Sequence, residues 1–422
     1  MLRKLTITGF KSIYEQKIDF GKVNLFLGTN GSGKSNILEA IAVLASALSR
    51  GLDPISLDSK GVRLSLPHIF KSAFRNTDLK PHFRLEAQFT HGRYECSIRS
   101  NAKRSALEFH SEALYDNSRK VFGRGPNGIN LNPAFMDLNS EELRGTDLSR
   151  SLWDVVGIFA RVSSELRSEL DQLASFAIYA PQTTIMRGGA IDSRPVEPLG
   201  LTGSGLASAF NDVLQVHREL PAEEIKARNK LMSLIWSPGW ADQIRIGSHD
   251  SNIVPSHVVS EGLQLYIRDK FMKTNRNFVS TFDASEGTLY LIFVVSLLMH
   301  NETPKTFGLD NVDGTLNPEL VRQLTRSIVM ACTDRARYEG AAAYQIFMTS
   351  HHPSSLDSFD IFNDQQRVFV VKRRPTSPAK GSTVLDRLLP PPETSKEDWA
   401  DKMEGRNLST ILLENKIPGA LG

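Results

Sequence analysis

The chain has 422 residues, with 50 lysines and arginines against 47 aspartates and glutamates and an apolar content of 40%. This composition is typical of a soluble globular protein of two or three lobes, and it excludes a disordered or fibrous chain. The longest apolar run, residues 291–299, is too short for a membrane span, and no signal-peptide segment follows the start, so we expect a cytoplasmic protein without membrane contact.

The first 50 residues predict a strand, a glycine-rich turn and a helix. Residues 5–13 and 17–27 alternate or run apolar with β-branched side chains, which is typical of strands. The second stretch leads directly into the glycine-rich turn. Residues 36–48 then carry apolar side chains at helical spacing, so a helix is expected to begin at the turn.

The next 200 residues predict a β-rich part followed by a helical part. Residues 81–99 alternate about a His-Gly turn and predict an antiparallel hairpin. Residues 117–132 are rich in Gly, Asn and Pro and predict a surface loop. Helical patterns over 148–173 and 206–235, separated by a glycine-rich segment, predict an inserted helical lobe.

The C-terminal part predicts the alternation of strands and helices of an α/β core. Short strands are expected at 263–267 and 278–282, followed by a strongly apolar helix over 288–300. Three further apolar runs, at 307–309, 346–348 and 368–371, are separated by helical segments. No heptad repeat is sustained over three or four repeats, so no long coiled coil is expected. Only the region near 390–394 is linker-like.

The sharpest local signal is a phosphate-binding loop. It fits the pattern G-x-x-x-x-G-K-[ST] between a predicted strand and a predicted helix, which is the context that the motif requires. Backbone N–H groups in such a loop surround phosphate oxygens, the lysine reaches the β and γ phosphates, and the serine hydroxyl joins the Mg²⁺ shell. The residues are Gly28, Thr29, Asn30, Gly31, Ser32, Gly33, Lys34 and Ser35.

The segments around this loop resemble the amino-terminal block of the SMC/RecF branch of ABC-type ATPases. The matching runs are Thr8-Gly9-Phe10-Lys11-Ser12-Ile13 and Asn36-Ile37-Leu38-Glu39-Ala40-Ile41. The branch includes the overcoming-lysogenisation-defect proteins and single-chain ATPases of bacterial antiphage systems. The resemblance implies that Lys11, Ser12 and Asn36 belong to the nucleotide site, and that two heads enclose two ATP molecules.

A second motif resembles the signature motif of this family. Asp283-Ala284-Ser285-Glu286-Gly287-Thr288-Leu289 stands directly before the predicted apolar helix. The resemblance implies that Ser285 and Gly287 face the γ-phosphate held by the opposite head, where a helix N-terminus favours anions. The alternative is that Ser285 serves only as a helix cap.

The run Phe307 to Pro318 resembles the Walker B strand and the D-loop of the family. The resemblance implies that Asp310 contacts Mg²⁺ and that Asn317 belongs to the end of the D-loop, which contacts the other head. Asn311 occupies the position of the usual catalytic glutamate, and an amide cannot act as general base. Asp313 is the substitute if the loop turns it inward, and a turn-forming role is the alternative.

The run Met348-Thr349-Ser350-His351-His352-Pro353 follows a predicted strand and resembles the switch segment whose histidine reaches the γ-phosphate. Alignment on the proline favours His351 over His352. The Q-loop of the family is not assigned, because no segment between residues 68 and 88 has a convincing pattern. Residues 178–182 and 187–189 are read either as lid or partner contacts or as ordinary strand and turn.

The remaining residues indicate no other chemistry. No catalytic triad, paired-carboxylate site or His/Cys metal cluster is apparent, and Cys96 and Cys332 are expected to be inert thiols. The basic run 372–374 is read as a solvated face, with binding to a phosphate backbone as the alternative.

The predicted fold class is α/β, a P-loop NTPase with an ABC/SMC-type head that contains a mixed core sheet, an antiparallel β sub-lobe and an inserted helical lobe. The expected division is an N-terminal ATPase lobe at 1–145, an inserted helical or lid region at 146–275, a C-terminal ATPase lobe at 276–390 and a tail at 391–422.

The resemblance implies an ATPase that binds ATP and Mg²⁺, forms a homodimer or a higher oligomer, and controls a separate effector such as a nuclease or toxin in antiphage defence. About 70 residues follow His351, too few for the Toprim nuclease of the overcoming-lysogenisation-defect proteins. Two alternatives stay open: a RecF-like ATPase of DNA repair that binds DNA ends, and a scaffold that holds ATP without hydrolysing it, which Asn311 favours.

Overall fold

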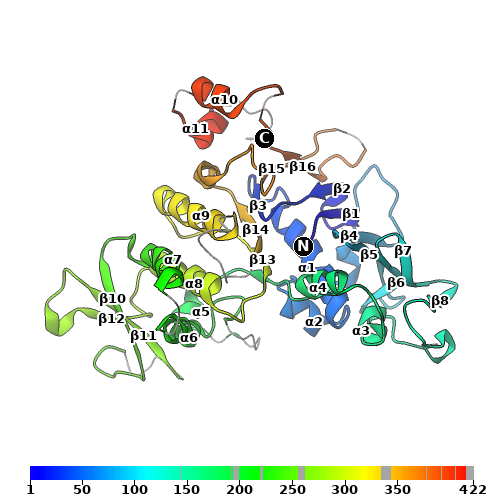
Figure 1. The fold of residues 1–422 in the computed structure, drawn as a ribbon, viewed down its shortest axis with the longest axis horizontal. Coiled ribbons are helices and arrows are strands. Elements are labelled where there is room, and N and C mark those ends of the chain that lie inside the picture. The colour runs from blue at the N-terminus through cyan, green and yellow to red at the C-terminus, as the bar shows by residue number, and fades with distance from the viewer. Residues whose placement is uncertain are drawn as a thin grey trace.

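The computed structural model describes residues 1–143, 145–190, 192, 199–218, 222–254, 262–333, 344–376, 378–390, 392–403 and 405–414. Within these residues the chain forms three sheets with helices between and around them (Figure 1). No described helix combines the length and the apolar character that a membrane crossing requires.

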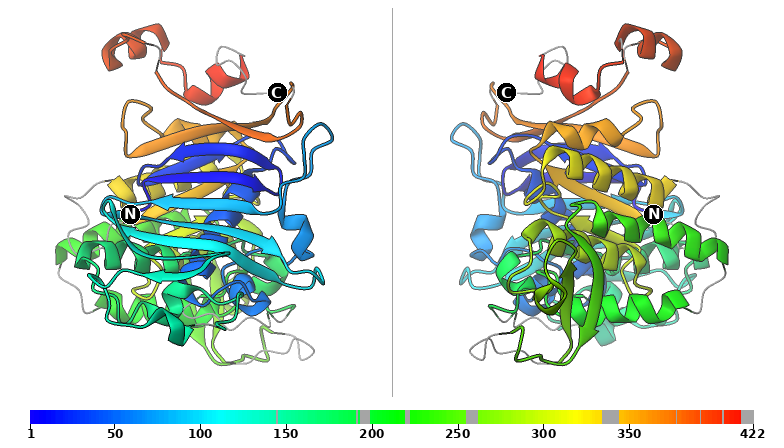
Figure 2. Two further views of the ribbon diagram at one scale, coloured as in Figure 1. Left: turned by 90° about the vertical axis from the view of Figure 1, so that its right-hand side faces the viewer. Right: turned by 90° about the vertical axis from the view of Figure 1, so that its left-hand side faces the viewer.

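The first sheet is antiparallel and forms one face of the molecule, where its blue and cyan strands stack edge to edge (Figure 2, left). Its strand order is β2-β1-β4-β5-β6-β7-β8. The strands are β1 (Lys4–Phe10), β2 (Ile13–Asp19), β4 (Phe83–Gln88), β5 (Gly92–Ser100), β6 (Leu107–Asp116), β7 (Arg119–Gly125) and β8 (Gly128–Leu131).

The second sheet is the core sheet, and it positions the candidate site. Its order is β16-β15-β3-β14-β13-β9, with every neighbouring pair parallel except the antiparallel pair β15 and β16. The strands are β3 (Val23–Leu27), β9 (Ile178–Tyr179), β13 (Thr306–Leu309), β14 (Gln345–Ser350), β15 (Gln366–Arg373) and β16 (Thr383–Arg387). Because parallel strands end at the same edge, the loops after β3, β13, β14 and β9 converge there.

The third sheet is small and antiparallel, in the order β10-β11-β12. The third-sheet strands are β10 (Ala241–Gly247), β11 (Gln264–Asp269) and β12 (Phe278–Ser280).

The α-helices flank the sheets, with five short 3₁₀ turns among the described residues. The α-helices are α1 (Lys34–Ser49), α2 (Pro54–Ser59), α3 (Leu152–Val156), α4 (Ser164–Ala174), α5 (Thr183–Met186), α6 (Leu206–Arg218), α7 (Ala222–Met232), α8 (Glu286–Met299), α9 (Pro318–Thr333), α10 (Lys396–Met403) and α11 (Leu408–Leu413). The 3₁₀ turns are η1 (Pro67–Phe70), η2 (Ser140–Leu143), η3 (Ser233–Trp236), η4 (Thr274–Arg276) and η5 (Pro353–Ser358).

Helix α1 fills the space between the antiparallel sheet and the core sheet (Figure 1). All its residues from Ile37 to Leu48 are buried, because it has a sheet on each side. Phe26 of β3 lies in the same apolar cluster as α1, whereas its neighbour Leu25 joins the cluster around α8 on the opposite face of the core sheet. This alternation is the two-residue period of a strand that is buried on both faces.

Helix α8 is the centre of the second apolar cluster. It is buried from Thr288 to Met299, as expected of a helix that is apolar all round. The two cysteines, Cys96 in β5 and Cys332 in α9, are buried and form no disulfide. The α/β fold class with a mixed core sheet and an antiparallel sub-lobe is confirmed.

The structure corrects two local expectations and adds detail to the tail. Residues 117–132 were expected as a loop, but β7 and β8 form a hairpin there, because Val121 and Phe122 are buried and compensate for the flanking glycines. The pattern over 148–173 is two helices, α3 and α4, interrupted at Gly157. The tail from residue 391 contains α10 and α11, and Ser409 at the start of α11 bonds to Asp357 in η5, while residues 415–422 lie outside the described residues.

The inserted region expected at 146–275 is less separate than predicted. Helix α4 packs on α1, and β9 pairs with β13 inside the core sheet. Part of the region is also β-structure, since β10 and β11 belong to the third sheet. A two-residue strand such as β9 is too short to be recognised from a sequence pattern, so these boundaries could not be drawn in advance.

Candidate functional site

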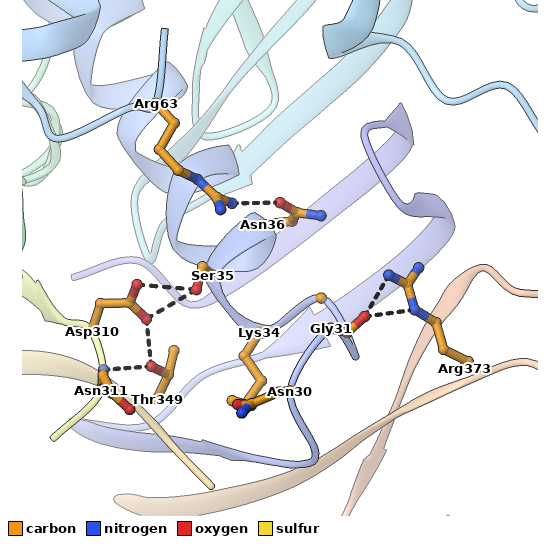
Figure 3. Close-up of a pocket in the computed structure, with 11 residues that line it drawn as sticks. Asn30, Gly31, Lys34, Ser35, Asn36, Arg63, Asp310, Asn311, Thr349 and Arg373 are labelled. Carbon is orange, nitrogen blue, oxygen red and sulfur yellow. Dashed lines mark hydrogen bonds between the residues drawn. The ribbon is translucent and has the colours of Figure 1, made fainter. Parts of the chain in front are cut away.

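The glycine-rich loop joins the end of β3 to the start of α1. Gly33 stands at the helix N-cap with φ of 106°, a conformation that suits glycine. A Cβ atom on Gly33 would also lie 2.0 Å from Thr383 Oγ1, so a side chain has no room there. The loop borders a cavity of about 480 Å³ (Figure 3). Its lining residues are Asn30, Gly31, Gly33, Lys34, Ser35, Asn36, Arg63, Asp310, Asn311, Thr349 and Arg373.

The Lys34 amino group lies at the centre of the loop. Its Nζ donates to the carbonyl oxygens of Gly28 at 2.6 Å and Thr29 at 3.0 Å. Burial lowers the pKa of Lys34, while the carboxylates of Asp313 and Asp310 act in the opposite direction. A cation that rests on neutral carbonyls can exchange them for phosphate oxygens.

Oxygen ligands gather at one end of the cavity. The Ser35 hydroxyl donates to both carboxylate oxygens of Asp310, at 3.1 and 3.0 Å, and the Thr349 hydroxyl donates to Oδ1 at 2.5 Å (Figure 3). A carboxylate beside a serine hydroxyl is the hard-oxygen donor set that Mg²⁺ prefers. The residues present therefore fit the metal that the sequence motif implies.

Asn311 follows Asp310 at the cavity wall. Its φ is 61°, in the left-handed region that asparagine tolerates better than most residues. Its backbone N–H donates to Thr349 Oγ1 at 2.8 Å. The side chain lines the cavity, but its amide has no basic group to accept a proton from water.

Asp313 is buried, with 1% of its side chain exposed, and it holds the switch segment. Its Oδ2 accepts from the backbone N–H groups of His351 at 3.1 Å and His352 at 2.7 Å, and lies 3.3 Å from His351 Nδ1. Its Oδ1 has no hydrogen-bond partner among the described residues. Asp313 thus turns inward, but its contacts are with the switch segment.

The two histidines have different environments. His352 Nδ1 accepts from the backbone N–H of Ser354 at 3.2 Å and lies 2.7 Å from its hydroxyl, so this ring caps η5. The His351 side chain is 44% exposed and keeps its contact with Asp313. The His351 ring is therefore the more exposed of the two, and neither histidine is among the residues that line the cavity.

The signature motif begins α8 and is separate from the cavity lining. Ser285 is exposed and caps the helix, since its Oγ accepts from Thr288 N at 3.4 Å. A Cβ on Gly287 would meet the Leu316 side chain at 3.3 Å, so the motif packs closely on the D-loop. Asn317 at the end of that loop caps α9 through Leu320 N. Neither Ser285 nor Gly287 is among the residues that line the cavity of the same chain.

Lys11 and Ser12 lie behind the loop and do not line the cavity. Lys11 Nζ forms an ion pair with Glu39, whose side chain is 2% exposed, and also lies 4.7 Å from the centre of the Phe70 ring. Ser12 Oγ accepts from Asn36 Nδ2 at 2.6 Å. In this structure the side chains of Lys11 and Ser12 contact residues of helix α1 and do not face the cavity.

A family model described as "AAA domain, putative AbiEii toxin, Type IV TA system" matches residues 23–357, which is more than half of the chain. The chain belongs to this AAA-domain family.

Two curated proteins match short stretches of the chain. The chain is 44% identical over 71 residues to the DNA double-strand break repair Rad50 ATPase of Archaeoglobus fulgidus, a match that covers 16% of this chain and 8% of that protein. It is 49% identical over 49 residues to the DNA replication and repair protein RecF of Magnetococcus marinus, covering 11% of this chain and 13% of that protein. The matches thus span a small part of either relative.

Among solved structures, the crystal structure of an SMC head bound to the C-winged helix domain of ScpA is similar to the chain with a TM-score of 0.51. The sequence identity is 15%, and the likeness covers 92% of this chain and 97% of that chain. The fold of this AAA-domain protein is therefore that of an SMC head, and the resemblance to SMC/RecF-type ABC ATPases is confirmed.

Sequence reasoning missed three residues of the cavity. Arg63 reaches it from the segment after α2, where its NH2 donates to Asn36 Oδ1 at 3.0 Å and its Nε to Glu39 at 2.5 Å. Thr349 is the last residue but one of β14, and Arg373 ends β15. The available signal for Thr349 was its place directly after the apolar run 346–348, but no motif singles out the two arginines.

The core sheet also places a segment that the sequence left unassigned. Strand β9 lies beside β13, and Asp310 N donates to the Tyr179 carbonyl at 2.9 Å. Residues 180–182 therefore leave the core sheet at the edge where the cavity opens. Further on, Arg187 NH2 donates to the Ala284 carbonyl at 3.0 Å, which ties this segment to the signature motif.

Glu39 gives a stability prediction. Its carboxylate accepts from Lys11 and Arg63, so Glu39→Ala leaves the largely buried Lys11 ammonium without its partner. We expect a loss of about 3 kcal/mol in the free energy of unfolding, measured by urea denaturation. The exposed Glu15→Ala is the matched control and should change stability by less than about 0.5 kcal/mol. Equal stability of both variants would contradict this account of the ion pair.

Proposed function

We propose that the protein is an ATP-binding, slowly hydrolysing SMC/ABC-type ATPase whose heads close as a homodimer around Mg-ATP. The observation that supports the proposal is that the signature motif and the cavity are separate within one chain. The cavity has its own P-loop and Walker B residues, whereas the exposed signature serine lies outside the lining of that cavity. In the proposed dimer, a second copy brings its Ser285 to the phosphate.

Each residue has a role in this proposal. The loop from Gly28 to Ser35 surrounds the phosphates, and Lys34 contacts the β and γ phosphates. Ser35 and Asp310 hold Mg²⁺, which neutralises charge on the phosphates. His351 reaches the γ-phosphate.

Slow turnover follows from Asn311. An amide can orient a water molecule by hydrogen bonds but cannot take its proton, so the rate contribution of a general base is lost. Binding of ATP then has a longer lifetime than in a rapidly hydrolysing head. A long-lived closed dimer suits a switch that displays or releases a binding surface.

The effector is proposed to be a separate nuclease or toxin, and the role to be control of that effector in bacterial antiphage defence, in the cytoplasm. The support is the family to which the chain belongs, together with the resemblance to antiphage ATPases.

The second candidate is a DNA-repair ATPase that binds DNA ends, which the short matches to Rad50 and RecF favour. It requires phosphate release to rise when linear DNA is added. Turnover that is indifferent to DNA, together with loss of effector activity when the ATPase is removed, would favour the first candidate.

The dimer is tested at Ser285. We expect Ser285→Arg to prevent ATP-induced dimerisation, because a long cationic side chain replaces the small residue at the helix N-terminus that must approach the partner's nucleotide. Light scattering with a slowly hydrolysed ATP analogue should show dimers for the wild type and monomers for the variant.

Fluorescent-nucleotide binding by the monomer provides the control for Ser285→Arg. It should stay within about threefold of the wild-type value, because the variant leaves the cavity of its own chain intact. Full dimerisation of the variant would contradict the proposal.

A further inference from the structure

The C-terminal hairpin of β15 and β16 contacts the P-loop at two successive carbonyls. Arg373 Nε and NH2 donate to the Gly31 carbonyl at 2.8 and 2.5 Å, as Figure 3 shows. Thr383 Oγ1 donates to the Ser32 carbonyl at 2.8 Å. The hairpin lies more than 300 residues after the loop in the sequence, and no part of the P-loop motif requires these contacts.

The contact at Ser32 sets the direction of a phosphate-binding group. In a trans peptide the carbonyl and the following N–H point in opposite directions. A hydrogen bond from Thr383 to the Ser32 carbonyl therefore directs the Gly33 N–H away from β16, and Gly33 lines the cavity. The close approach of Thr383 is also a reason why residue 33 must be glycine.

Arg373 acts on the preceding peptide. The Gly31 carbonyl receives two N–H groups of one planar guanidinium, while Arg373 NH1 donates to Gly381 at 2.9 Å within the hairpin. The N–H of the same peptide, on Ser32, donates to Thr29 and closes the turn of the loop. The guanidinium thus fixes the orientation of the Gly31–Ser32 peptide.

Thr383 is held by a chain of hydrogen bonds in which each side chain donates to the next. Arg63 donates to Asn36 Oδ1, so the Asn36 amide must donate to Ser12 Oγ. The Thr383 proton is used on the Ser32 carbonyl, so the 2.7 Å bond between the hydroxyls of Ser12 and Thr383 has Ser12 as donor. The chain runs from an arginine in the cavity wall to a P-loop carbonyl.

We propose that Thr383 and Arg373 are positioning residues of the nucleotide site, through which the C-terminal hairpin sets the P-loop in the conformation that binds a triphosphate. The inference rests on the proposed function, because it takes ATP as the ligand of the cavity. It assigns a role to the basic run at 372–374, which sequence reasoning read as a solvated face.

The experiment measures Mg-ATP affinity of the full chain with a fluorescent ATP analogue. Thr383→Val removes the hydroxyl but keeps the side-chain shape and the backbone bond from Thr383 N to the Ser12 carbonyl. We expect its dissociation constant to rise about tenfold, because a buried carbonyl loses its donor. Thr383→Ser restores the hydroxyl and should bind within about twofold of the wild type.

Arg373→Lys provides the second arm. Lysine keeps the charge but cannot place two N–H groups on one carbonyl in a plane, so its affinity should fall by about fivefold. The melting temperature of the nucleotide-free protein separates positioning from a general fold effect. It should fall by no more than about 5 °C in Thr383→Val and Arg373→Lys, as the loss of a single buried hydrogen bond implies, while nucleotide affinity falls.

The outcomes distinguish the two proposals. A wild-type protein that does not bind ATP would overturn both. ATP binding by the wild type with unchanged affinity in Thr383→Val would overturn only the role of the hairpin. Equal losses of affinity in Thr383→Val and Thr383→Ser would also overturn it, because the hydroxyl would then have no part in the effect.

Discussion

Lys34→Ala is expected to lower Mg-ATP affinity by about 100-fold, because a charge-assisted contact to the phosphates in a half-buried cavity is lost. The Lys34 ammonium is already at the loop, where it rests on the carbonyls of Gly28 and Thr29. The wild type therefore needs only a short movement of this side chain to exchange carbonyl for phosphate oxygens. Alanine leaves the same backbone cradle without a cation.

Titration with a fluorescent ATP analogue measures this effect in the monomer. Lys103→Ala is a suitable control, since Lys103 is exposed and remote in sequence from the cavity residues. Its affinity should equal that of the wild type. If Lys34→Ala bound ATP with an affinity within a few fold of the wild type, the assignment of the P-loop and its cavity as the ATP site would be wrong.

Asn311→Glu is expected to raise the rate of phosphate release by about 100-fold. The change places a carboxylate next to Asp310, at the position where Asn311 lines the cavity. The left-handed backbone at residue 311 suits asparagine better than glutamate, so a stability loss of about 1 kcal/mol is expected alongside the gain. Single-turnover release of phosphate measures the chemical step without contributions from nucleotide exchange. No increase would mean that hydrolysis, if it occurs, uses another base.

Asp313 is the alternative general base, and two variants distinguish this role from its hydrogen bonds to the switch segment. Its Oδ2 accepts two backbone N–H groups of the switch segment. Asp313→Asn keeps an acceptor oxygen for them but cannot act as a base, whereas Asp313→Ala loses both functions. We expect Asp313→Asn to hydrolyse ATP within about threefold of the wild type and Asp313→Ala to be much slower. Equal inactivity of the two variants would instead identify Asp313 as the base.

The sequence predicted those parts of the fold whose signals are local. The helix after the glycine loop and the apolar helix α8 have clear apolar patterns, and each was placed within a few residues. The stretch 17–27 before the loop contains the end of β2 and the whole of β3. The hairpin of β7 and β8 was missed because its glycines and asparagines resemble a loop, while its burial depends on a neighbouring strand. Strand β9 was only one of two interpretations of residues 178–182, because two residues are too few to show a period.

The same distinction applies to the site. Lys34, Ser35 and Asp310 belong to motifs with fixed spacing, and the structure brings all three together at one cavity. Arg63 and Arg373 reach that cavity from segments whose position depends on the order of strands in two sheets. The roles of Lys11 and Ser12 differ from expectation for a related reason. Their partners Glu39 and Thr383 are close in space only after the sheets have formed.

The burial of both cysteines makes the native chain convenient for distance measurements. Burial raises the pKa of the Cys96 and Cys332 thiols, and neither is accessible to a maleimide dye in the folded state. A single cysteine introduced on the surface could therefore be labelled with a fluorophore without replacing Cys96 or Cys332. Mixing donor-labelled and acceptor-labelled copies would then report the approach of two heads in real time as energy transfer.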